Sequence, residues 1–306
     1  MTPNVVGSYC DSYNPNGQTD TACSAPSQKG KPIEIYSFID PLCPDCWGLE
    51  PNIKKLHLEY GHTFRLRHLI GGNIQTFNSF KRKNEGIKTH ADVAQRWERT
   101  ASRSGMSCDG DLWYEDPMDT PYIAAIAIKA AELQGKLPGF RYLRKMRELL
   151  FIKKQNMTKE ENLIQAARET GLDVDEFKKD LQSQAAVKAL QCDLKISTEM
   201  EVEELPTLVF FNENIEEEGL KITGVYDYEV YVRILTEMLK TKPEPKPLPS
   251  LEEFMSLYQF VATKEVAVVY DLTCEEADAE MKKLALKQRV EKVPVKHGCF
   301  WRTINA

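Results

Sequence analysis

Two cysteines separated by two residues form the one close pair among the eight cysteines of the chain. They are Cys43 and Cys46, in the string Cys-Pro-Asp-Cys. A cysteine at the start of a helix lies among backbone N–H groups without intrahelical partners, and these groups and the helix dipole favour the thiolate. The spacing lets Cys46 resolve a mixed disulfide formed at Cys43. The pair therefore predicts a thiol–disulfide exchange site. The alternative is an exposed pair that the function does not need.

Asp45 changes the chemistry expected of this pair. Its carboxylate lies beside Cys43 and disfavours a second negative charge there. We therefore expect a weaker oxidant than a related protein with histidine between its cysteines.

The second candidate component of the exchange site is a proline that follows a leucine and precedes an apolar strand. Thioredoxin-type sites place a cis proline opposite the cysteines, and Pro206, in Glu-Leu-Pro-Thr, has the right position. Few X-Pro bonds are cis, so position carries this prediction. The alternative is a trans proline that opens an edge strand.

Cys10 and Cys23 raise the question of zinc. Together with Cys43 and Cys46 they could supply four thiolates, but structural zinc sites usually use two close pairs, and no histidine precedes His57. Free thiols are the favoured interpretation, and no cofactor is expected. The remaining cysteines occur singly and are interpreted as small apolar side chains or ordinary thiols: Cys108, Cys192, Cys274 and Cys299.

The elements around the pair are typical of a thioredoxin fold. Alternating and helical periodicities predict β-α-β, then a helical block over about 88–200, then β-β-α. The predicted strands and helices outside the block are Ile33–Ile39, Cys43 to about Tyr60, Phe64–Ile70, Thr207–Phe211, Leu220–Thr223 and about Tyr228–Leu239. The predicted class is α/β, a thioredoxin domain over 31–241 with a large helical insertion.

Two further segments flank this domain. Residues 1–30 are polar and lack apolar periodicity, which predicts a flexible arm. Residues 242–250 carry proline at every second position from Pro243 to Pro249, which is typical of an extended linker.

Beyond the linker, 251–306 predicts a small α+β module that resembles a winged helix. Its expected elements are a helix to Val261, a strand over Glu265–Tyr270, a helix over Thr273–Lys287 and a hairpin that turns near His297. The module holds eight Lys and Arg against nine Asp and Glu. A DNA-binding surface is basic, so nucleic-acid binding is disfavoured.

Composition supports a globular cytosolic protein. The net charge is −6, and 42% of the residues are hydrophobic. No apolar run approaches the roughly 18–20 residues of a membrane span, and the N-terminus has no signal-peptide pattern. The chain is expected to bind neither membranes nor nucleic acids.

Several strings resemble a known family. Asp40–Trp47 with Leu49-Glu50-Pro51 is similar to the cytosolic branch of the DsbA-like proteins. Longer strings resemble the SpxH (YjbH) family of ClpXP adapter proteins over nearly the whole chain from about residue 31. They are Thr100–Asp111, Lys129–Gly135, Gln184–Asp193, Phe260–Glu265, Val268–Leu272, Met281–Ala285 and Lys296–Gly298.

The resemblance implies a cytoplasmic adapter that binds the regulator Spx and promotes its degradation by the ClpXP protease in unstressed cells, without chemistry on Spx. The alternative function is a cytosolic DsbA-like oxidoreductase that uses Cys43, Cys46 and Pro206. The family's N-terminal arm is associated with histidine, cysteine and zinc. This arm keeps Cys10 and Cys23 but has no histidine.

Overall fold

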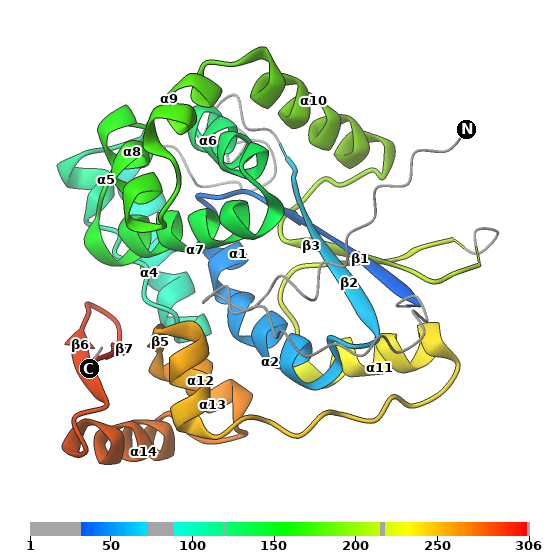
Figure 1. The fold of residues 1–306 in the computed structure, drawn as a ribbon, viewed down its shortest axis with the longest axis vertical. Coiled ribbons are helices and arrows are strands. Elements are labelled where there is room, and N and C mark those ends of the chain that lie inside the picture. The colour runs from blue at the N-terminus through cyan, green and yellow to red at the C-terminus, as the bar shows by residue number, and fades with distance from the viewer. Residues whose placement is uncertain (1–31, 73–88, 119, 215–217, 305–306) are drawn as a thin grey trace.

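The computed structural model describes residues 32–72, 89–118, 120–214 and 218–304. The predicted N-terminal arm lies outside these ranges, so the expectation of a flexible segment is not addressed by the structure. The described chain forms a sheet with helices against it, a block of helices beside it, and a smaller module that holds the C-terminal strands (Figure 1).

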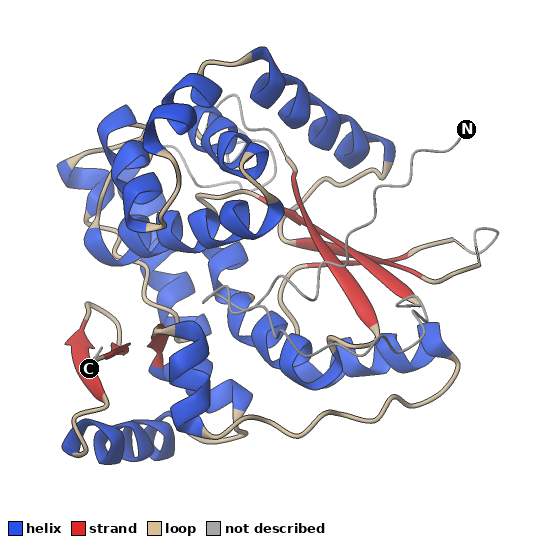
Figure 2. Ribbon diagram, viewed as in Figure 1, coloured by secondary structure: helices blue, strands red, loops and turns tan. Residues whose placement is uncertain are grey.

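The larger sheet has four strands in the order β2-β1-β3-β4. Figure 2 shows its strands in red, with helices on both sides of them. β1 pairs in parallel with β2 and antiparallel with β3, and β3 pairs antiparallel with β4. The strands are β1 (Ile33–Ile39), β2 (Phe64–Ile70), β3 (Thr207–Phe211) and β4 (Leu220–Thr223). This β-α-β and β-β-α order confirms the predicted thioredoxin arrangement.

β1 and β3 are the central strands of this sheet, and most of their residues are buried; Glu34 is their one exposed residue. Ile33 and Ile35 pack with α2 (Glu50–Tyr60) and α11 (Tyr228–Leu239) on one face. Phe38 packs toward α10 on the other face. Burial of such side chains contributes about 1.5–3 kcal/mol each.

The predicted helix from Cys43 to Tyr60 is divided into two helices. α1 (Pro44–Gly48) ends before Leu49, and α2 begins at Glu50. Pro51 lies in the first turn of α2 and has no backbone N–H to continue the hydrogen-bond ladder of α1. The break leaves the cysteine pair on a short helix of its own.

A block of helices lies between β2 and β3 in the chain. Its core holds large buried side chains, among them Trp97, Trp113 and Phe151. The helices are α4 (His90–Ser104), α5 (Leu112–Glu115), α6 (Tyr122–Leu133), α7 (Lys136–Lys153), α8 (Glu160–Glu169), α9 (Val174–Leu181) and α10 (Gln184–Glu199).

The C-terminal module follows an extended segment that runs along α2, where Lys246 N–H donates to the carbonyl of Glu59 at 2.8 Å. Its sheet has the order β5-β7-β6. The order of helices and strands is that of a winged helix. The elements are α12 (Leu251–Tyr258), β5 (Phe260–Ala262), α13 (Thr263–Val269), α14 (Cys274–Leu286), β6 (Val290–Pro294) and β7 (Cys299–Thr303).

One predicted strand is wrong. Glu265–Tyr270 is rich in β-branched residues, but Thr263–Val269 is helix α13. The carboxylate of Glu265 accepts the N–H of Ala262 at 2.7 Å and so caps the helix. Val266 and Val269 on this helix are buried in the module core. Capping and tertiary packing therefore outweigh β-propensity here.

The module is fixed to the rest of the chain by a buried cluster of charges. Glu265 is fully buried and accepts from Lys54 of α2 at 2.5 Å and from Arg144 of α7 at 2.9 and 3.0 Å. Arg144 also donates to Glu50 at 2.5 Å and to Glu148 at 2.9 Å. Burial alone would raise the pKa of Glu265, but Arg144 and Lys54 outweigh this effect and lower the pKa to about 2.

Aromatic packing completes the contact. Phe300 of β7 stacks on Trp47 of α1, with ring centroids 6.3 Å apart and an angle of 6° between the planes. The guanidinium of Arg144 lies 4.5 Å from the ring of Trp47. The residue next to Cys46 is therefore covered by the C-terminal module.

Replacing Glu265 with alanine is expected to lower the free energy of unfolding by about 3–5 kcal/mol, because buried Lys54 loses its ion-pair partner and Arg144 loses one of three. Urea unfolding followed by tryptophan fluorescence measures this loss. The matched control is Glu291→Ala, which removes an exposed ion pair to Arg302 in the same module and should cost less than about 1 kcal/mol. Equal losses for the two variants would contradict the assigned role of the cluster.

The same carboxylate predicts a pH dependence. Because the pKa of Glu265 is depressed from 4.5 to about 2 in the folded protein, its stabilisation is complete above pH 4.5 and is lost as pH falls toward 2. One pKa unit corresponds to about 1.4 kcal/mol, so the loss is about 3 kcal/mol. Unfolding free energies of wild type and Glu265→Gln, measured from pH 6 to 2, should fall more steeply for wild type. Parallel curves would contradict this assignment.

Candidate functional site

Cys43 lies at the start of a helix, as its position in the sequence predicts. It is the N-cap of α1 with φ −82° and ψ 122°, and its Sγ accepts the backbone N–H of Cys46 at 3.4 Å. Pro44 occupies the first helical position, where a missing N–H costs nothing. The local geometry is that of a thioredoxin-type cysteine pair.

Pro206 is preceded by a cis peptide bond, which confirms the predicted isomer. It comes directly before β3, whose first residue, Thr207, is paired with Phe38 near the end of β1. β1 leads into the loop that carries Cys43. The antiparallel register therefore places Pro206 at the same end of the central strands as the two cysteines, although the sequence separates them by 160 residues or more.

Both sulfurs of the pair are buried. Cys43 is 5% exposed and Cys46 is 2% exposed. Burial, and then the hydrogen bond with Cys43, raises the pKa of the Cys46 thiol well above its ordinary value. A disulfide of another molecule can reach these sulfurs only after neighbouring groups move. The site has the arrangement of an exchange centre without open access.

A third thiol lies in the same environment and was missed by the sequence analysis, which treated it as an isolated cysteine. Cys108 is fully buried in the same apolar cluster as Cys43 and Cys46. Burial, and then the charges of Asp45 and Cys43, raises the pKa of the Cys108 thiol. Its spacing in the sequence gives no signal, because more than sixty residues separate it from the pair.

The charge of Asp45 is compensated by two arginines of α4. Arg103 forms an ion pair with one carboxylate oxygen, and Arg96 lies 3.3 Å from the other. The weaker oxidising power expected from Asp45 stays a prediction, and these two guanidinium groups oppose the effect on which it rests.

Behind Cys46, a small cavity of about 30 Å³ has a largely apolar lining that also includes Arg147 and His68. Arg147 is 2% exposed; it donates to Glu50 at 2.8 Å and to the carbonyl of Asp40 at 3.4 Å, and its Nε has no hydrogen-bond partner among the described residues. Burial raises the pKa of Asp40 to about 6. Burial, and then Arg147 and Lys129, lowers the pKa of His68 to about 3. Arg147 was also missed by the sequence analysis, because it is one of several charged residues in the middle of α7, beside Arg144, Lys145 and Glu148.

Of the four residues considered for zinc, Cys43 and Cys46 belong to the described ranges and lie side by side. Cys10 and Cys23 lie outside the described residues. Zinc binding by the four thiolates therefore stays a prediction, and free thiols stay the favoured interpretation. Within the described ranges, one group of acidic side chains is close enough to hold a cation: Glu98, Asp109 and Asp111. Lys296 already lies 2.7–3.2 Å from these carboxylates, so they fix the β6–β7 turn.

A family model described as thioredoxin matches residues 36–233 of the chain. Relatives named ClpXP adapter protein SpxH match much more of it. The protein of Halalkalibacterium halodurans is 53% identical over 278 residues, which is 91% of each chain. The proteins of Bacillus subtilis and Bacillus licheniformis are 52% and 54% identical and cover 90% of each chain.

Solved structures with the same fold are more distant in sequence. A putative protein disulfide isomerase from Nitrosomonas europaea has a TM-score of 0.56 at 17% identity and covers 68% of this chain and 96% of its own. A probable DsbA oxidoreductase from Streptomyces coelicolor has a TM-score of 0.53 at 14% identity, covering 71% and 94%. These likenesses concern the fold.

Among the helices of the described ranges, none has both the length and the apolar character that crossing a bilayer requires.

Burial of the thiols predicts slow alkylation. At pH 7, iodoacetamide should modify Cys46 and Cys108 about tenfold or more slowly than the exposed Cys192, because a buried protonated thiol is a poor nucleophile. Peptide mass spectrometry measures the three rates in one sample. In denaturing urea the three rates should become equal. Rates that are already equal in the native protein would contradict the described burial.

Proposed function

This chain belongs to the SpxH family of ClpXP adapter proteins, and from this premise we propose that it binds the transcription regulator Spx and promotes its degradation by ClpXP under non-stress conditions. The observation that carries the proposal is the identity of 52–54% to three relatives over about 90% of each chain. That span exceeds the thioredoxin match, which ends at residue 233. It therefore extends beyond the thioredoxin domain into the C-terminal module.

The burial of the thiols supports an adapter rather than an enzyme. A thiol–disulfide oxidoreductase needs an accessible thiolate, whereas Cys43 and Cys46 are almost fully buried and the pKa of Cys46 is raised. An adapter needs affinity for a client and a surface of fixed shape. The charge cluster around Glu265 supplies such a surface by fixing the module to the thioredoxin domain.

A second candidate is a cytosolic DsbA-like oxidoreductase. The cysteine at a helix N-terminus and the cis proline at the same end of the sheet favour it. Both features are also part of the fold, and a fold carries many functions. This candidate therefore remains the alternative.

Nucleic acid is not the proposed partner of the winged-helix-like module. α14 occupies the place that the recognition helix has in DNA-binding proteins of this topology. Its first two turns carry four acidic residues, which would face the phosphates of DNA with the wrong charge: Glu275, Glu276, Asp278 and Glu280. The proposed partners are Spx and ClpXP in the cytoplasm.

The proposed function predicts that the purified protein accelerates ClpXP digestion of Spx several-fold in a reconstituted assay. A variant with Cys43→Ser and Cys46→Ser should act as well as wild type, because the proposal assigns no chemistry to these thiols. A substrate that ClpXP digests without an adapter serves as the control for protease activity. No acceleration by wild type would contradict the adapter function.

Insulin reduction by the same preparations tests the alternative. The expected rate is no higher than that of the dithiol reagent alone. A higher rate for wild type that the double serine variant loses would favour the oxidoreductase.

A further inference from the structure

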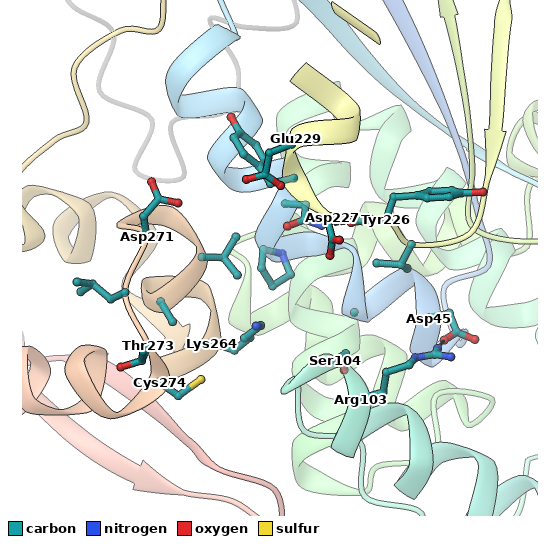
Figure 3. Close-up of a pocket in the computed structure, with 18 residues that line it drawn as sticks. Asp45, Arg103, Ser104, Tyr226, Asp227, Glu229, Lys264, Asp271, Thr273 and Cys274 are labelled. Carbon is teal, nitrogen blue, oxygen red and sulfur yellow. Dashed lines mark hydrogen bonds and ion pairs between the residues drawn. The ribbon is translucent and has the colours of Figure 1, made fainter. Parts of the chain in front are cut away.

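A cleft of about 690 Å³ lies between the thioredoxin domain and the C-terminal module (Figure 3). One wall is the segment Val225–Glu229, which leads from β4 into α11. The opposite wall is formed by α13 and the start of α14, and α1 and the end of α4 close a third side. We call this feature the Tyr226 cleft. Its volume falls within the roughly 300–1,000 Å³ of ligand-binding clefts.

Large apolar side chains are exposed on the first wall. Val225 is 41% exposed and Tyr226 is 44% exposed. Small or apolar groups line other parts of the cleft, among them Gly48, Pro51 and Ala267. A cleft with this lining stabilises a bound apolar side chain by removing it, and Tyr226, from water.

Negative charge borders the apolar lining. Asp227 and Glu229 are exposed, and neither has an ion-pair partner in the described part of the chain. The remaining two carboxylates of the cleft are already compensated, because Asp45 is paired with arginines and Asp271 with Lys55. In Figure 3, Asp227 lies beside Tyr226 and Glu229 lies farther along the same segment, across from α13, while the ring of Tyr226 extends to the side away from α13.

The lining as a whole favours a cation. Four carboxylates line the cleft against two cationic side chains, Arg103 and Lys264. Arg103 is held by Asp45. Lys264 packs its methylene groups beside Gly105, where a Cβ would lie 3.0 Å from Lys264 Cδ. Like Asp227 and Glu229, Lys264 has no ion-pair partner among the described residues, so the unpaired groups of the cleft carry a net charge of −1. Both unpaired acids lie on the first wall, which therefore attracts a cation.

We propose that the Tyr226 cleft is the docking site for a segment of the client protein that carries a large apolar side chain next to lysine or arginine. The apolar side chain packs against Val225 and Tyr226, and the cation pairs with Asp227 and Glu229. This inference rests on the proposed adapter function and assigns a surface and a partner chemistry to it. Charge-assisted hydrogen bonds of this kind contribute more than neutral ones.

The module must stay docked for this cleft to exist, because its two main walls belong to different parts of the chain. Lys264 and Ala267 flank Glu265, whose carboxylate is held by Lys54 and Arg144 on the side away from solvent. The buried charge cluster thus holds the second wall in place before a partner arrives. A preorganised cleft binds more tightly, since no ordering free energy is lost on binding.

Charge reversal on the first wall tests the proposal. Asp227→Lys with Glu229→Lys should raise the Kd for fluorescently labelled Spx about tenfold or more, as measured by anisotropy. Tyr226→Ala should weaken binding in the same direction. Added salt should weaken binding to wild type more steeply than binding to the double variant. Only wild type has the ion pairs of Asp227 and Glu229 with the client, and salt screens such exposed pairs.

The matched control is Asp175→Lys with Glu176→Lys, which makes the same charge change in the first turn of another exposed helix, α9. It should bind Spx like wild type. Urea midpoints of all variants report whether they fold; Asp227 makes no side-chain capping hydrogen bond, so its replacement removes none.

Each outcome decides between the proposals. If wild type binds Spx and accelerates its digestion while the Asp227 and Glu229 variant fails and the control succeeds, the docking site is supported. If wild type is active and the variant is equally active, the docking site is wrong and the adapter function stands. If wild type neither binds nor accelerates digestion, the adapter function itself is wrong. A wild-type dimer in sedimentation that the variant abolishes would assign the cleft to a second copy and overturn the proposal.

Discussion

The buried carboxylate of Glu265 and its two cations set the geometry of this molecule. Lys54 belongs to α2 of the thioredoxin domain, Arg144 to the inserted helical block and Glu265 to the C-terminal module. A charge buried there alone would be strongly unfavourable. Glu265 compensates only one of the two positive charges, and Glu50 and Glu148, which also pair with Arg144, supply further negative charge. Each of the three segments therefore completes the environment of the other two. The relative positions of domain, insertion and module follow from this requirement, and so does the position of every surface that lies between them.

That constraint explains the state of the cysteine pair. The helix that carries it is short because Pro51 ends its hydrogen-bond ladder, and Trp47 at its centre is covered by Phe300 and Arg144. The thiols keep the backbone geometry of an exchange site but lie below the surface. A redox motif and an adapter function are therefore compatible in one chain, since the fold supplies the motif and the packing removes its access.

The same docking that closes one surface creates another. The cleft beside Tyr226 exists where the module meets the thioredoxin domain, and its free acidic groups lie on the side of the domain. An acidic wall and an acidic α14 disfavour nucleic acid and favour a basic protein segment. The winged-helix topology serves here to complete a cleft and to cover α1.

The sequence by itself determined the thioredoxin order of elements, the helix start at Cys43, the cis bond at Pro206 and the family. The elements follow from local residue patterns, and the family follows from several sequence strings that occur in the same order along the chain. It misassigned Glu265–Tyr270, because the β-propensity of its valines does not include the cap and the burial that make it a helix. Tertiary structure alone decided that Cys108 lies among the buried thiols, that Arg147 lies behind Cys46 and that Asp227 faces a cleft. These contacts join residues tens to hundreds of positions apart, and no local spacing encodes such a meeting.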